Sequence, residues 1–197
     1  SNGQFTPQFD IVGPVTLPED MTYYGGTSSK GNDERTAQMV VDACELVKDS
    51  ADFSLYDSNN DGYVDLVYVI YAGYGQSMGA ANNTVWPQAT YVRSQAEYNG
   101  KKIYRAGVNN ELIGNENTFN GEPAITGLGL FIHEFSHCLG LPDFYASTLT
   151  SSIYDNQGME DWSVMDNGIY KSNGWTHTAY TAWEREAMGW KTIEKRT

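Results

Sequence analysis

The sequence lacks the features that would tie it to nucleic acid or to a membrane. Only 12 of its 197 residues are lysine or arginine, against 25 aspartates and glutamates, and the formal charge is -13. Because phosphate binding requires a basic surface, we expect no nucleic-acid partner. No apolar run approaches the roughly 20 residues that a transmembrane helix needs, so we expect no membrane span. The chain begins at Ser1 without a charged and then hydrophobic leader, and we expect it to be a processed piece.

Cysteine is also scarce. The two cysteines, Cys44 and Cys138, permit one disulfide, whereas a disulfide-dependent scaffold of this length would carry more. Both residues fall in apolar helical patterns. A disulfide and two buried free thiols therefore both stay open.

The first part of the chain carries mainly strand signals. The first thirty residues mix short apolar stretches with prolines and glycines, which favours strand and loop and leaves no place for a helix. Residues 63–72 form a β-branched and aromatic run, which predicts a central strand that is buried on both faces. Asn99-Gly100 tolerates positive φ at both positions and predicts a tight β-hairpin turn.

Three segments have helical spacing of their apolar residues. The segment 34–48 predicts a backing helix that packs one face inward. The segment 127–139 predicts a helix that stops at Gly140, and the segment 179–188 predicts a closing helix. Together with the strands, these segments predict an α+β fold with one substantial core.

The helix predicted at 127–139 contains the pattern H-E-x-x-H at residues 133–137. Residues four apart lie one above the other on a helix, so the imidazoles of His133 and His137 can bind the same ion. Glu134 lies beside that ion and can take a proton from its bound water without occupying the coordination sphere. The chain has only three histidines, so this spacing favours a zinc site over two ordinary, partly buried histidines.

A tetrahedral zinc ion needs a third protein ligand from elsewhere. Gly140 can adopt the left-handed conformation that ends a helix and reverses the chain, which would return Asp143 to the metal. We therefore predict a zinc site made of His133, His137 and Asp143. On spacing alone, other third ligands stay open: Glu160, Asp161 and His177.

A methionine follows within Ser163-Val164-Met165 and could form a turn beneath the zinc site, although methionine is more often core filler. The pattern H-E-x-x-H-x-x-G-x-x-D followed by S-V-M resembles the metzincin clan. Specifically, it resembles the immune inhibitor A family of bacterial secreted metallopeptidases. Further family motifs extend the resemblance over nearly the whole chain, at residues 5–15, 57–65, 72–76 and 182–190.

The resemblance implies a metzincin-like fold with a twisted mixed β-sheet, a backing helix, an active-site helix, and an irregular C-terminal lobe with a closing helix. It implies one catalytic domain over residues 1–197, with an upper subdomain at 1–140, a lower one at 141–197, and a methionine turn at Met165. The implied activity is zinc-dependent hydrolysis of peptide bonds in proteins or peptides, by a metal-activated water with a glutamate base. The implied setting is a monomer at or outside a bacterial surface, made with a propeptide and further domains.

A tyrosine after the methionine turn stabilises the oxyanion in related peptidases. Tyr170 is the nearest candidate here, although its interval differs from the commonest one. The chain has 14 tyrosines, so a packing role for Tyr170 also stays open.

The segment 57–65 has the pattern of a cation-binding loop, with oxygen-bearing side chains at alternate positions and glycine at the sixth. It predicts a structural Ca²⁺ site formed by Asp57, Asn59, Asp61, Tyr63 and Asp65. The twelfth position, where an EF-hand has a bidentate glutamate, is Tyr68, so this is not a complete EF-hand. A polar turn that leads into the strand is the alternative.

Two other interpretations of the whole chain compete with a zinc peptidase. A metal amidase of the deformylase kind would take an upstream cysteine as third ligand, and only Cys44 could serve, without the glycine-rich surroundings that this chemistry needs. A calcium-stabilised extracellular binding or adhesion module with an inactive zinc site is the alternative from outside the enzymes.

Overall fold

The computed structural model describes residue 1 and residues 3–26, 33–145 and 158–194. These residues form a mixed α+β structure that divides into two compact units. One unit is Ile11–Thr126, and the other comprises Ser1–Asp10 and Gly127–Thr197. The predicted subdomain boundary at residue 140 stays a prediction. No helix in the described part of the chain is long and apolar enough to span a bilayer.

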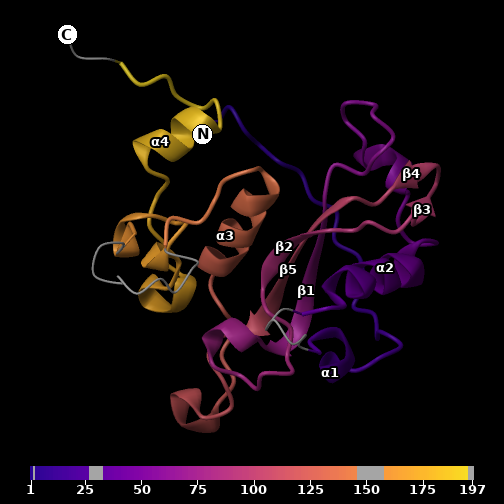
Figure 1. The fold of residues 1–197 in the computed structure, drawn as a ribbon, viewed down its shortest axis with the longest axis horizontal. Helices are drawn as coiled ribbons and strands as arrows, with labels where there is room; N and C mark the ends of the chain where they lie inside the picture. Colours follow the sequence, from indigo (N-terminus) through magenta and orange to yellow (C-terminus); the bar gives the residue numbers. More distant parts are fainter. Residues whose placement is uncertain (2, 27–32, 146–157, 195–197) are drawn as a thin grey trace. The chain divides into compact units, whose positions relative to one another are not determined.

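A small mixed sheet forms the first unit's framework (Figure 1). Its order is β1 (Val67–Tyr74), β5 (Arg105–Leu112) and β2 (Gln88–Tyr91), with β1 parallel and β2 antiparallel to β5. The prediction that the apolar run forms a central strand buried on both faces is wrong, because β5 is central among the described strands. Ile70 of β1 is 62% exposed while its neighbour Tyr71 is buried, so β1 has one buried face only.

Helix α2 (Thr36–Val47) packs against all three strands of this sheet and confirms the predicted backing helix. Its inward residues Met39, Val40 and Cys44 lie in one core with Val108 of β5. Fully burying a side chain of valine or methionine size contributes about 1.5–3 kcal/mol, so this face holds the helix on the sheet.

A short helix, α1 (Met21–Tyr24), contradicts the prediction that the first thirty residues hold no helix. The Asp20 side chain caps it by accepting a hydrogen bond of 2.9 Å from the Tyr23 N–H. A single capped turn is too short to give an apolar period, which explains why the sequence pattern missed it.

The predicted hairpin is confirmed. Strands β3 (Glu97–Tyr98) and β4 (Lys101–Lys102) pair antiparallel, and the turn between them has φ of 50° at Asn99 and 76° at Gly100. The described residues of the first unit also form three short 3₁₀ helices: η1 (Phe53–Tyr56), η2 (Gln76–Met78) and η3 (Thr118–Gly121).

The second unit contains α3 (Leu128–Cys138) and α4 (Ala182–Ala187), which confirm the two predicted helices. Between them lie η5 (Glu160–Trp162), η6 (Asn167–Ile169) and η7 (Lys171–Gly174). Helix α4 is shorter than predicted, because Thr181 is its N-cap. Its apolar residue Trp183 is 51% exposed while Glu184 is wholly buried, so an acidic residue occupies the inward position.

Candidate metal centre

Helix α3 ends in a chain reversal at Gly140. The Gly140 N–H donates to the His137 carbonyl at 2.9 Å, and the Leu141 N–H donates to the Ser136 carbonyl at 3.0 Å. This pair of bonds is the Schellman motif, and Gly140 has the left-handed φ of 104° that the motif requires. The reversal turns the following segment, which carries Asp143, back toward the helix.

Three side-chain atoms from these segments converge. The Nε2 atoms of His133 and His137 are 3.1 Å apart, and Oδ1 of Asp143 is 3.2 Å from the first and 3.0 Å from the second. Ligand atoms held about 2.0–2.1 Å from a tetrahedral ion lie roughly 3.3–3.4 Å from one another. Among the described residues, no other group of three or more His, Cys, Asp or Glu residues could hold a metal ion.

Hydrogen bonds at the far side of each imidazole fix its orientation. His133 Nδ1 lies 2.9 Å from the Val164 carbonyl, and His137 Nδ1 lies 2.7 Å from the Leu141 carbonyl. A carbonyl only accepts, so each Nδ1 carries hydrogen and each Nε2 of a neutral ring is an acceptor. The Asp143 Oδ1 is buried and receives no hydrogen bond. Three acceptors therefore face one another, an arrangement that a cation stabilises.

The pKa shifts have the same cause. Burial alone would raise the pKa of Asp143, but the two imidazoles beside it hold that pKa well below its usual range. Burial alone would lower the pKa of His137, but Asp143, the Leu141 carbonyl and the charge of Glu134 outweigh it and raise that pKa. The raised pKa of His137 indicates that the field at this imidazole favours positive charge, and the lowered pKa of Asp143 keeps its carboxyl group ionised.

Glu134 is buried, and its negative charge acts on two groups of the site. It raises the pKa of His137 and contributes to the raised pKa of Tyr145, for which burial is the largest cause, followed by the charge of Asp143. The Tyr145 ring stacks on the His133 ring with centroids 6.5 Å apart. Sequence reasoning missed Tyr145, although its position two residues after Asp143 was an available signal. Tyr170 also contributes to the raised pKa of Tyr145, and Tyr170 itself is 41% exposed.

The segment Ser163–Met165 bonds both to helix α3, at His133, and to the chain next to Asp143. All three residues are wholly buried. The Val164 carbonyl accepts from His133, and the Met165 carbonyl accepts the Phe144 N–H at 2.9 Å, next to Asp143. The predicted methionine position therefore lies in the layer that supports the site.

The alternative third ligands lie in segments with other contacts, through the backbone of Glu160 and Asp161 and through the His177 ring. The Glu160 N–H donates to Asp166 at 2.6 Å, the Asp161 carbonyl accepts from Thr178, and His177 Nδ1 lies 3.2 Å from the Thr178 carbonyl. None of the three belongs to the converging group.

Both cysteines are buried free thiols, so the possible disulfide is not formed. Burial raises the pKa of Cys44 to about 12, and Cys44 is not part of the converging group. These observations count against a thiolate third ligand of the deformylase kind.

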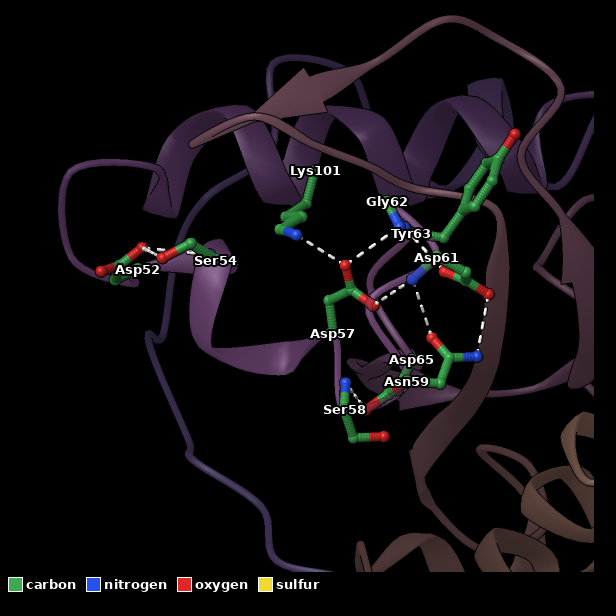
Figure 2. Close-up of polar contacts among 10 residues, drawn as sticks. All are labelled: Asp52, Ser54, Asp57, Ser58, Asn59, Asp61, Gly62, Tyr63, Asp65 and Lys101. Carbon is green, nitrogen blue, oxygen red and sulfur yellow. Dashed lines mark hydrogen bonds and ion pairs between the residues drawn. The ribbon is translucent and has the colours of Figure 1, made fainter.

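Figure 2 shows the predicted calcium loop, which carries an ammonium group beside its first carboxylate. Asp57 accepts hydrogen bonds from the N–H groups of Asp61 and Gly62, at 2.9 and 3.0 Å, and the Lys101 Nζ lies 2.6 Å from its Oδ2. Lys101 lowers the pKa of this buried carboxyl.

The other predicted calcium ligands bond within the loop. Asn59 bonds to Asp61, Asp61 accepts from the Tyr63 N–H at 2.9 Å, and Asp65 accepts from the Ser58 N–H at 3.1 Å. Calcium binding stays a prediction, and it requires the ion to compete with Lys101 for Asp57.

A helix with H-E-x-x-H, whose imidazoles meet a carboxylate returned by the chain reversal, defines a metallopeptidase class. A sequence profile described as immune inhibitor A peptidase M6, catalytic domain, matches residues 1–192. Because the match covers nearly the whole sequence, the chain belongs to this family of metallopeptidases.

Two relatives agree with the family. The chain is 26% identical to immune inhibitor A of Bacillus thuringiensis subsp. alesti, over 94% of this chain and 30% of that protein. It is 25% identical to pre-pro-metalloprotease PrtV of Vibrio cholerae serotype O1 (strain M66-2), over 95% of this chain and 22% of that protein. The chain thus spans less than a third of the length of either relative.

Proposed function

We propose that this chain is a zinc-dependent endopeptidase domain that hydrolyses peptide bonds in proteins or peptides. In this proposal, His133, His137 and Asp143 hold the zinc ion and Glu134 is the general base. One observation carries the proposal: three acceptor atoms, of which Asp143 Oδ1 receives no hydrogen bond, converge within 3.2 Å of one another.

Zinc, when bound, supplies Lewis-acid chemistry that polarises the scissile carbonyl and makes water acidic near neutral pH. Glu134 accepts the proton of the attacking water and then delivers it to the leaving amine. Its burial supports this role, because the carboxylate is shielded from bulk water. Tyr170 donates its phenolic hydrogen to the oxyanion of the substrate.

We also propose that the fold is metzincin-like. It would have a subdomain at 1–140 above the metal, one at 141–197 below it, and a methionine turn at Met165. The hydrogen bond between Val164 and His133 supports a turn of this kind. The predicted Ca²⁺ at Asp57–Asp65 has a structural role in this scheme.

The setting of the domain is also a proposal. We infer that it is secreted or lies at the surface of a bacterium, and that it is made within a longer precursor with a propeptide. The name of PrtV, a pre-pro-metalloprotease, and the greater length of both relatives support this view. Membership in a peptidase family argues against an adhesion module with an inactive zinc site.

The test compares two variants of the zinc-loaded chain on a casein substrate. Glu134→Gln keeps the shape of the side chain but cannot accept the proton, so we expect zinc to stay bound while cleavage falls by at least about 100-fold. His137→Ala removes a ligand, and we expect both zinc and cleavage to be lost. Zinc content is measured by elemental analysis. Retained turnover in Glu134→Gln would show that another group is the base, and zinc without cleavage in the parent would favour a binding protein.

A further inference from the structure

Glu184 is a carboxylate in an unusual position, because a side chain at the start of a short helix is normally solvated. It is wholly buried. Its Oε1 accepts the Ser163 hydroxyl at 2.8 Å, and its Oε2 accepts the Thr181 N–H. Within the part of the chain that the structure describes, Glu184 forms no ion pair. Burying a carboxylate without a cation is unfavourable, so its bonds to these two donors must be maintained.

The bond from Ser163 to Glu184 has a definite direction. A carboxylate is only an acceptor, so the Ser163 hydroxyl hydrogen points to Glu184. The lone pairs of the same oxygen then face the Met165 N–H, which donates to it at 2.9 Å. Glu184 thereby orients the hydroxyl that fixes the turn from Ser163 to Met165.

The turn Ser163–Met165 bonds to one candidate ligand, His133, and to Phe144, the residue that follows Asp143. The Val164 carbonyl accepts from His133 Nδ1 at 2.9 Å, and the Met165 carbonyl accepts from the Phe144 N–H, one residue after Asp143. A change in the position of these carbonyls changes the direction of the His133 ring and the position of the Asp143 segment.

We propose that Glu184 is a positioning residue of the metal centre, acting through the Ser163 hydroxyl on the turn that orients His133 and the Asp143 segment. This inference rests on the proposed zinc site. Glu184 also forms a capping box with Thr181 at the start of α4. A capping box alone requires neither burial of the glutamate nor a bond to Ser163, so the two roles can be separated.

The experiment uses the full chain loaded with zinc and measures the rate of zinc release to a chelator. Ser163→Ala and Glu184→Ala both break the link, and we expect zinc release to become about 10–100-fold faster, as for other residues that orient metal ligands. Glu184→Gln keeps an oxygen that can accept from Ser163, so we expect it to restore most of the slow release. Thr181→Ala removes the capping hydroxyl but not the link, and we expect the parent rate.

A second readout is the absorption spectrum of the chain loaded with cobalt, which reports the ligand geometry directly. We expect it to change in Ser163→Ala and to keep the parent form in Thr181→Ala. Should Glu184→Ala fail to fold, Ser163→Ala and Glu184→Gln still test whether the bond between these two residues positions the metal centre. Parent-like release and spectra in Ser163→Ala would overturn the inference, as would equally fast release in Thr181→Ala. A parent chain that binds no zinc would instead refute the proposed site itself.

Discussion

Replacing Gly140 by alanine tests the chain reversal that returns Asp143 to the two histidines. No heavy atom lies within 4 Å of the Cβ that would be added, so the substitution causes no clash. Only the backbone conformation matters, because Gly140 has a φ of 104° that an alanine rarely adopts. An L-residue in the left-handed region costs about 1–2 kcal/mol.

This cost appears in two measurable quantities. A loss of about 1–2 kcal/mol should lower the melting temperature of the zinc-loaded chain, at this length, by roughly 2–8 °C. The zinc-bound state requires the reversal, whereas the zinc-free chain can relax and relieve the strain. Zinc affinity should therefore fall by about 5–30-fold, which is the same free energy expressed as an equilibrium constant.

The assay is zinc competition against a chromophoric chelator, with Gly189→Ala as the matched control. Gly189 ends α4 with the same pair of bonds, has a φ of 71°, and also has open space for a Cβ. Both variants should lose similar stability, but only Gly140→Ala should lose zinc affinity. If Gly140→Ala melts at a lower temperature yet binds zinc as tightly as the parent, the reversal does not deliver a ligand.

Three further predictions concern other parts of the molecule. Lys101 lowers the pKa of Asp57, so this carboxylate stabilises the fold above its unfolded pKa of about 3.9, and the contribution is lost as pH falls. Between pH 5 and 3, the free energy of unfolding measured with urea should therefore fall more in the parent than in Asp57→Asn. Lys101→Met removes the competing ammonium, so calorimetry should detect tighter Ca²⁺ binding than in the parent, and no heat in either chain would contradict the calcium prediction. Tyr170→Phe should lower kcat on a peptide substrate by about 100-fold with little change in KM, and an unchanged kcat would leave Tyr170 without a catalytic role.

Local sequence patterns were sufficient to predict the elements whose structure depends only on residues close together in the chain. The helix with H-E-x-x-H, the left-handed turn at Gly140 and the hairpin at Asn99-Gly100 each depend on residues a few positions apart, and each was predictable. The convergence of Asp143 on the two histidines follows from the same short segment.

Long-range partners were not predictable from the sequence. The apolar run of β1 gives no sign that β5 takes the central place in the sheet, because pairing depends on strands far apart in the chain. Likewise, nothing near Glu184 indicates that it bonds to Ser163, 21 positions away. Lys101 approaches Asp57 only because the hairpin carries it there. In each case the physical cause is tertiary packing rather than local propensity.

X-ray absorption at the zinc edge of the zinc-loaded chain tests the central claim most directly. The proposed site predicts two imidazole nitrogens and one carboxylate oxygen from the protein at about 2.0–2.1 Å, and His133→Ala and His137→Ala should each lose the bound zinc. A sulfur ligand at about 2.3 Å, or zinc that still has two imidazole ligands in either variant, would contradict it.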